Sequence, residues 1–232
     1  MSEERGKKVG LIAQYRFVFL FLTLIVFFLT KALSQDHQTE DIANTLFLFI
    51  IVYSLYVIGH EKRFLIIVLS LFALAELTVL LSSYFIDSNL LLVLNILFGL
   101  LFLLTMTIAC LNYTLHDERI TVTTLFGSLC AYLFVGLTWA YAYLFIDVID
   151  PQSFGLLEDI VNFDDKLEQF IYYSFVTLTT LGFGDVSPLT SYAMTVTYLQ
   201  AIFGQLYLVI LVSRLVGMYM GKVPAEKPPQ PD

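Results

Sequence analysis

One stretch of the chain, residues 177–186, has the residue types and the spacing that chemistry would need, because it reads Thr-Leu-Thr-Thr-Leu-Gly-Phe-Gly-Asp-Val. Gly182 and Gly184 stand at alternate positions and permit backbone angles that a side chain would forbid. The backbone carbonyls can then turn inward, while the Leu181 and Phe183 side chains point outward as packing struts. A column of backbone oxygens of this kind is suited to holding a dehydrated cation.

Thr180 adds a hydroxyl below the lowest of these carbonyls, and Thr179 and Asp185 flank the stretch. The run Thr-Thr-Leu-Gly-Phe-Gly-Asp between two apolar segments resembles the selectivity filter of the potassium-channel family, which reads Thr-Val-Gly-Tyr-Gly followed by Asp. The resemblance implies that potassium ions are the permeant ligands and that Thr179 and Asp185 support the filter and its outer mouth. It assigns ion binding to Thr180, Leu181, Gly182, Phe183 and Gly184.

Two positions depart from the family pattern. Leu181 stands where valine is commoner and Phe183 where tyrosine is. Both keep an outward apolar side chain, but phenylalanine lacks the hydroxyl that could hydrogen-bond the helix behind the filter. We expect potassium selectivity to survive, and a weakly selective K+/Na+ channel of the same architecture is the alternative. A secondary transporter usually shows repeated halves, which this sequence lacks, whereas a non-conducting scaffold that keeps the filter sequence stays open.

The composition indicates an integral membrane protein. Of the 232 residues, 58% are hydrophobic and 16% aromatic, and the mean hydropathy is +0.81, which leaves too little polar surface to coat a soluble globule. Cys110 and Cys130 fall within or beside apolar segments, where a thiol behaves as a small hydrophobe. The three histidines lie on separate loops and cannot converge on a metal within one chain. The sequence also offers no enzyme constellation, no cofactor site and no nucleic-acid-binding pattern.

Six apolar segments approach or exceed the ~20 residues that a helix needs to cross a bilayer. The first, 17–33, follows a basic arm. Its end overlaps Ala-Leu-Ser at residues 32–34, which can also be read as a signal-peptidase site. Because it is longer than the ~7–15 residues of a signal core, we interpret it as a membrane span. The other predicted spans are 42–59, 64–86, 90–113, 120–146 and 191–217.

The pattern predicts an all-α membrane protein of six transmembrane helices with a re-entrant pore helix over 166–179. Asp164 and Asp165 stand at the start of that helix, where the macrodipole favours negative charge. Tyr172, Tyr173 and Phe175 are expected to brace the filter from behind. The predicted organisation is a cytoplasmic arm (1–16), a four-helix scaffold (17–113), a cytoplasmic linker (114–119), a pore domain (120–217) and a short polar tail (218–232).

A single filter strand cannot enclose an ion. Non-helical backbone at membrane depth must be buried in protein or line a wet path, so several copies of the chain are required. The resemblance, which covers the pore domain, implies a homotetramer with cyclic symmetry. Further copies of this chain and membrane lipids are therefore the expected partners.

Charge sets the expected orientation. With six spans and the N-terminus inside, all twelve Lys and Arg residues except Lys31 and Lys166 fall in cytoplasmic segments, as the positive-inside rule requires. Both termini are thus expected in the cytoplasm, the membrane being the plasma (inner) membrane. The outer loop between the last two spans carries eight carboxylates, which either concentrate cations at the entrance or form a solvated loop.

Several intramembrane residues have two interpretations. In related channels a glycine at the depth of Gly204 lets the inner helix bend, and the alternative is close helix packing. Glu76 lies inside a span, where an acidic group costs ~2.5–3.5 kcal/mol. It is either a proton- or cation-sensing site or, the reading that we favour, a neutral or paired acid bonded to Asn44 or Asn95. Arg214 is expected to anchor its helix at the interface by snorkelling.

The segment 90–113 occupies the place of a voltage sensor in six-span channels but contains no Lys or Arg. One charge crossing the full potential supplies only ~2.3 kcal/mol per 100 mV, and steep gating needs several in each subunit. We therefore predict that opening depends weakly on voltage and that the first four spans form a scaffold or receive another stimulus. Conductance measured against voltage in reconstituted bilayers checks this, and a steep sigmoidal activation curve would contradict it.

Overall fold

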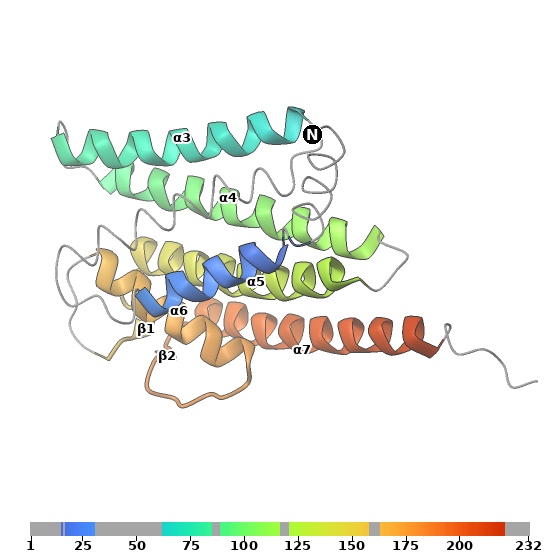
Figure 1. The fold of residues 1–232 in the computed structure, drawn as a ribbon. Coiled ribbons are helices and arrows are strands. Elements are labelled where there is room, and N and C mark those ends of the chain that lie inside the picture. The colour runs from blue at the N-terminus through green and yellow to red at the C-terminus, as the bar shows by residue number, and fades with distance from the viewer. Residues whose placement is uncertain are drawn as a thin grey trace, which may run out of the picture.

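The computed structural model is mostly helical in the parts of the chain that it describes, which are residue 15 and residues 17–30, 62–84, 89–116, 121–157 and 163–220. An N-terminal helix, Phe17–Thr30, precedes the helices that are labelled in Figure 1. These are α3 (Lys62–Tyr84), α4 (Asn89–His116), α5 (Val122–Ile149), α6 (Phe163–Leu178) and α7 (Ser191–Met220).

The long helices lie side by side (Figure 1). α3 packs on α4, and α4 packs on α5, while α7 lies on the other side of α5. The shorter α6 packs mainly on α5 and also contacts α7. α7 and the loop that follows α6 therefore occupy the side of the molecule away from α3.

Three of the described helices contain segments long and apolar enough to cross a membrane, namely Asn89–Thr114, Val122–Ile149 and Ser191–Arg214. They correspond to the last three predicted spans. The first predicted span overlaps the shorter apolar helix Phe17–Thr30, and the third overlaps α3. The predicted span 42–59 lies outside the described residues. The described chain is thus that of a helical membrane protein.

Helix α6 begins earlier than the sequence predicted. It starts at Phe163 and ends at Leu178, so Asp164 and Asp165 lie in its first turn instead of preceding it. The shift has a simple cause, because an acidic residue in the first turn interacts favourably with the partial positive charge of the helix N-terminus and need not stand outside the helix.

An aromatic cluster fixes α6 against α5. Tyr143 of α5, Phe154 of the short strand β1 (Phe154–Gly155), and Phe170 and Tyr173 of α6 are buried together. The rings of Phe154 and Phe170 meet edge to face with centroids 5.1 Å apart, a geometry that adds about 0.5–1.5 kcal/mol to area burial. The buried face of α6 is therefore turned toward α5.

A second cluster joins the N-terminal helix to α3, α4 and α5. Phe17, Leu20 and Leu24 are completely buried in it. At its edge the ring of Phe28 packs edge to face on Phe175 of α6, with centroids 5.3 Å apart. The first apolar helix thus contacts α6 directly.

A two-stranded antiparallel sheet joins the loops at one end of the helices. β1 (Phe154–Gly155) pairs with β2 (Ser187–Pro188). Beside it, the Leu189 N–H donates to the Ser153 carbonyl at 2.8 Å. The loop after α5 is therefore held to the segment that enters α7.

Candidate functional site

Beyond the end of α6, every second residue from 180 to 184 adopts a left-handed backbone conformation. Thr180, Gly182 and Gly184 have φ angles of 61°, 56° and 79°, all in the left-handed region. The two glycines adopt it without penalty, which is the freedom expected of them from the sequence. Thr180 was not expected to adopt it, because a positive φ is a genuine outlier for a β-branched residue. Such a residue stores on the order of 1–3 kcal/mol and persists only where its surroundings fix it.

The N–H groups at the start of this segment are held by the end of α6. Thr180 N–H donates to the Thr177 carbonyl at 3.0 Å, and Leu181 and Gly182 N–H both donate to the Val176 carbonyl, at 2.9 and 3.4 Å. These bonds tie the outgoing strand back onto the last turn of the helix. They supply the constraint that keeps Thr180 in its strained conformation.

The carbonyl groups of the same strand have no such partners. Among the residues that the structure describes, no backbone or side-chain donor bonds the carbonyl oxygens of residues 180–184. Backbone acceptors left without a protein donor require water or a cation. The first three N–H groups of residues 180–184 therefore bond the protein, and the carbonyl oxygens are left available to a ligand.

The outward side chains of the strand do not act as struts within one chain. Leu181 is 61% exposed and Phe183 is 66% exposed. Tyr173 and Phe175, expected behind the filter, pack against α5 and the N-terminal helix. The cluster that holds Tyr173 also contains Val186, just beyond Asp185, so the bracing role stays a prediction.

Tyr172 contacts the outer end of the strand. Its hydroxyl donates to a carboxylate oxygen of Asp185, and the other carboxylate oxygen accepts the Val186 N–H at 2.9 Å. Tyr172 therefore supplies a hydroxyl to this region although Phe183 has none. The contact was missed because residues 13 apart on a helix and a loop share no periodic signal.

The C-terminal end of α6 lies against α7. A Cβ added at Gly204 would lie 3.0 Å from the Leu178 carbonyl oxygen and 2.8 Å from the Leu178 Cδ1. That carbonyl also accepts the Tyr132 hydroxyl at 3.3 Å. Of the two interpretations of Gly204, close packing is the one that these contacts support, and α7 continues unbroken through it.

Residues 120–220 match a protein-family model described as an ion channel. This part of the chain is therefore similar to an ion channel family. Comparisons with curated proteins and with solved structures find no match. The matched range, called the ion channel segment below, contains α5, α6, residues 180–184 and α7. It therefore includes the elements that position the unpaired carbonyls.

At the cytoplasmic end of the channel segment as predicted, Arg214 does more than anchor a helix in the interface. Its guanidinium donates to the carbonyl of Thr114 in the last turn of α4. A cation at a helix C-terminus complements the partial negative charge there. Arg214 thus connects α7 to α4, which corrects the expectation from the sequence.

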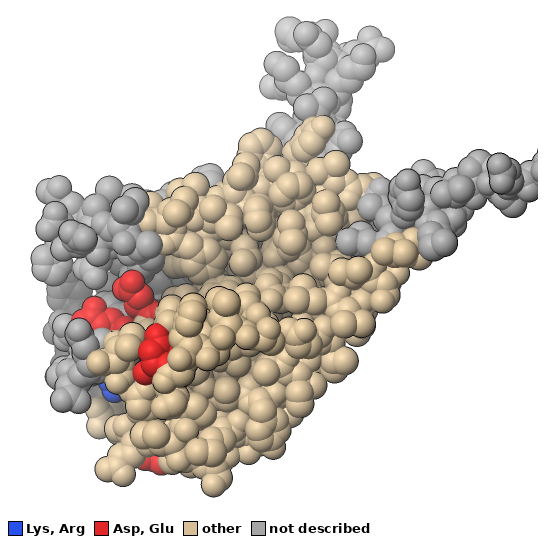
Figure 2. Space-filling view, turned by 90° about the horizontal axis from the view of Figure 1, so that it is seen from below, with Lys and Arg blue, Asp and Glu red and all other residues tan. Residues whose placement is uncertain are grey.

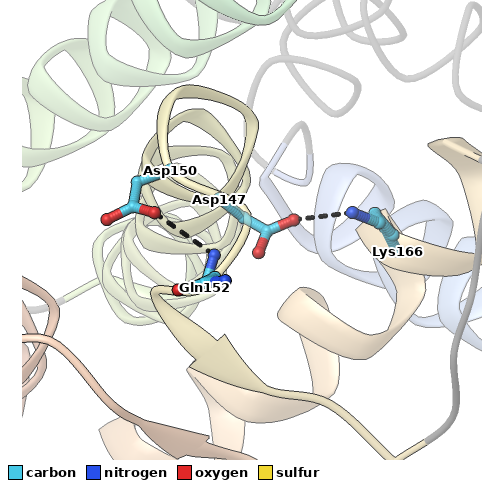
Figure 3. A network of polar contacts seen from close by, with 4 residues as sticks. All are labelled: Asp147, Asp150, Gln152 and Lys166. Atoms are coloured by element: carbon cyan, nitrogen blue, oxygen red, sulfur yellow. Dashed lines mark hydrogen bonds and ion pairs between the residues drawn. The ribbon is translucent and has the colours of Figure 1, made fainter.

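Two of the carboxylates in the loop between the last two predicted spans, those of Asp147 and Asp150, have partners in the structure (Figure 3). Lys166 Nζ and Asp147 Oδ2 form an ion pair at 2.8 Å, with the Asp147 side chain only 1% exposed. Asp150 accepts hydrogen bonds from the Gln152 N–H at 3.3 Å and from the Tyr192 hydroxyl. In Figure 2 the acidic side chains that are visible lie mainly toward one end of a face that is otherwise mostly uncharged.

Glu76 belongs to α3, and its side chain lies outside what the structure describes, as does Asn44. Asn95 Nδ2 donates to the carbonyl of Ala75 at 3.3 Å. The predicted partner thus reaches the backbone next to Glu76, and both interpretations of the carboxyl group stay predictions.

We predict that Gly204→Ala destabilises the folded channel by about 1–3 kcal/mol, the usual cost of overpacking. The added Cβ would press on a backbone carbonyl of α6, which cannot rotate away. Gly217→Ala is the matched control, because no atom lies within 4 Å of its added Cβ and it gains about 1 kcal/mol of helix preference. Thermal unfolding of the purified protein compares them, and equal stabilisation of both variants would rule out the packing role.

We predict that Tyr172→Phe accelerates the decay of the ionic current during sustained opening, because Asp185 loses the hydroxyl that holds the outer end of the strand. Tyr192→Phe is the control, since it removes a hydroxyl bond to another outer carboxylate, that of Asp150. Macroscopic currents from both variants give the comparison. An equal change in the two would show that the filter contact has no special role.

External pH provides a separate check of this contact. The Tyr172 hydrogen bond lowers the pKa of Asp185 below its ordinary value of 3.8. A carboxyl group with a lowered pKa contributes stability that is complete above the ordinary value and lost as the pH falls through the lowered one. Acidification from about pH 7 to 5 should therefore leave the current decay unchanged. Even an unshifted Asp carboxyl group, with a pKa of about 3.9, stays ionised over that range. A current decay that becomes faster between about pH 7 and 5 because Asp185 is protonated would contradict the role assigned to the Tyr172–Asp185 hydrogen bond.

Proposed function

We propose that the chain forms a potassium-selective channel in which residues 180–184 of four copies surround one axis. The observation that carries the proposal is the division of hydrogen bonding in this strand. The N–H groups of Thr180, Leu181 and Gly182 are tethered to α6, and the carbonyl oxygens of residues 180–184 have no donor among the described residues. Four such strands would replace the hydration shell of a permeating K+ ion with backbone oxygens.

Helix α6 favours a cation at the inner end of this path. Its C-terminus carries the partial negative charge of the macrodipole, and it ends at Leu178, directly before the strand. Four converging helix ends would add their fields at the axis. The ion would then meet favourable charge both in the strand and at its inner end.

The uncovered surface of α7 supports assembly from several copies. Only 11% of the apolar segment Ser191–Arg214 is buried, compared with 44% of Val122–Ile149. Apolar side chains along most of its length are exposed, and the loop that follows α6 lies on the same side of the molecule as α7 (Figure 1). We infer a homotetramer in which residues 120–217 form the pore and residues 17–113 the scaffold, with six spans, both termini in the cytoplasm and the plasma membrane as its site.

A weakly selective cation channel is the second candidate. It is favoured by the exposure of Leu181 and Phe183, because their side chains give the strand little packing support unless neighbouring copies cover them. A loosely held ring of oxygens discriminates less between K+ and the smaller Na+.

We predict that the reversal potential of the purified, reconstituted protein follows the K+ gradient when K+ and Na+ are present on opposite sides. Gly182→Ala is the matched negative control. Its added Cβ has open space around it but sits at a φ of 56°, where a side chain costs roughly 1–2 kcal/mol. It should lose selective conduction through backbone strain alone. A reversal potential that ignores the K+ gradient would favour the weakly selective channel, and absence of flux would favour a non-conducting scaffold.

A further inference from the structure

Gln200 is a polar side chain of α7 that is completely buried at membrane depth. Its carboxamide Oε1 accepts a hydrogen bond from the Tyr143 hydroxyl of α5. Its Nε2 donates to two atoms of Ser174 in α6, the carbonyl oxygen at 3.0 Å and Oγ at 2.7 Å. One side chain therefore connects the three helices of the ion channel segment.

The hydrogens of this network can be arranged in one consistent direction. Ser174 Oγ accepts from Gln200 and donates to the Gly136 carbonyl of α5 at 2.6 Å. Both N–H bonds of the amide are used, and its oxygen is occupied by Tyr143. A fully satisfied buried network rigidifies its surroundings, whereas removal of one member leaves the others unpaired.

Gln200 also sets the register between α6 and α7. Gln200 meets Ser174, and Gly204 meets Leu178, so the two contacts are four residues apart on both helices. Four residues are about one helical turn. Because the contacts recur after one turn on each helix, sliding or rotation of α7 would break both.

The contact lies close to the strand with the free carbonyls. Ser174 is two residues before Val176, whose carbonyl accepts the N–H groups of Leu181 and Gly182. A displacement of α6 at Ser174 is therefore passed to the strand through these two hydrogen bonds. The path from Gln200 to Gly182 contains only hydrogen-bonded neighbours and two residues of α6, about half a helical turn.

We propose that Gln200 is a positioning residue for ion selectivity, which it controls by fixing α6, and through α6 the filter strand, relative to α7. This inference rests on the proposed function. Gln200 touches no permeating ion, and its effect is exerted through Ser174. The position of α7 thereby becomes a determinant of the spacing of the filter oxygens.

The test compares K+/Na+ permeability ratios from reversal potentials of purified channels in planar bilayers. Gln200→Leu should lower the ratio about tenfold, the factor that matches the loss of a buried hydrogen bond. Ser174→Ala, which keeps the bond to the Ser174 carbonyl, should lower it less. The double variant should be no worse than Gln200→Leu, because the two residues act through one contact. Thr105→Val is the control, since it removes a hydroxyl that bonds only the Leu101 carbonyl of its own helix, at 2.7 Å.

The outcomes separate this inference from the proposed function. A native channel that does not discriminate K+ from Na+ overturns the proposed function. A selective native channel whose ratio is unchanged in Gln200→Leu overturns the role of Gln200 alone. Fewer active channels with an unchanged ratio would mark a purely structural role and also overturn it. Should Gln200→Leu fail to assemble, Ser174→Ala decides, because a native ratio in that variant contradicts the proposal.

Discussion

Unpaired backbone carbonyls at membrane depth are the constraint on which the rest of this structure depends. In hydrocarbon every backbone polar group needs a partner, and irregular backbone is tolerated only inside protein or beside water. The strand after α6 meets half of this demand within the chain, through the N–H bonds to the last turn of α6. The carbonyl oxygens of residues 180–184 have no donor among the described residues, so that their partners must come from outside the described chain.

Two different forces hold the helix that carries this strand. Toward α5, α6 packs through aromatic rings such as Phe170 and Tyr173. Toward α7 it relies on hydrogen bonds and on the close approach at Gly204. The second arrangement suits a membrane, where lipid is as apolar as the side chains, so that helix association depends on small residues and on interhelical hydrogen bonds of about 0.6–2 kcal/mol each.

The sequence predicted the features that one local rule controls. Apolar length located α4, α5 and α7 to within a few residues, and the alternate glycines anticipated the backbone angles at Gly182 and Gly184. It did not predict the contacts of Gln200 or Arg214. These helices are apolar around most of their circumference, so no periodic signal tells which face meets a neighbour, and the partners lie 26 and 100 residues away.

The angle at Thr180 shows why part of the site follows only from the assembled neighbours. No local preference favours a left-handed β-branched residue, and the strain is sustained by N–H bonds that exist only after α6 is in place. Those bonds constrain one edge of the strand. Leu181 and Phe183 are exposed, and the loop that carries them lies on the side of the molecule where α7 also lies (Figure 1). A neighbour that covers α7 would therefore also reach the strand, and one packing event would both bury the apolar face and complete the constraint on the carbonyls.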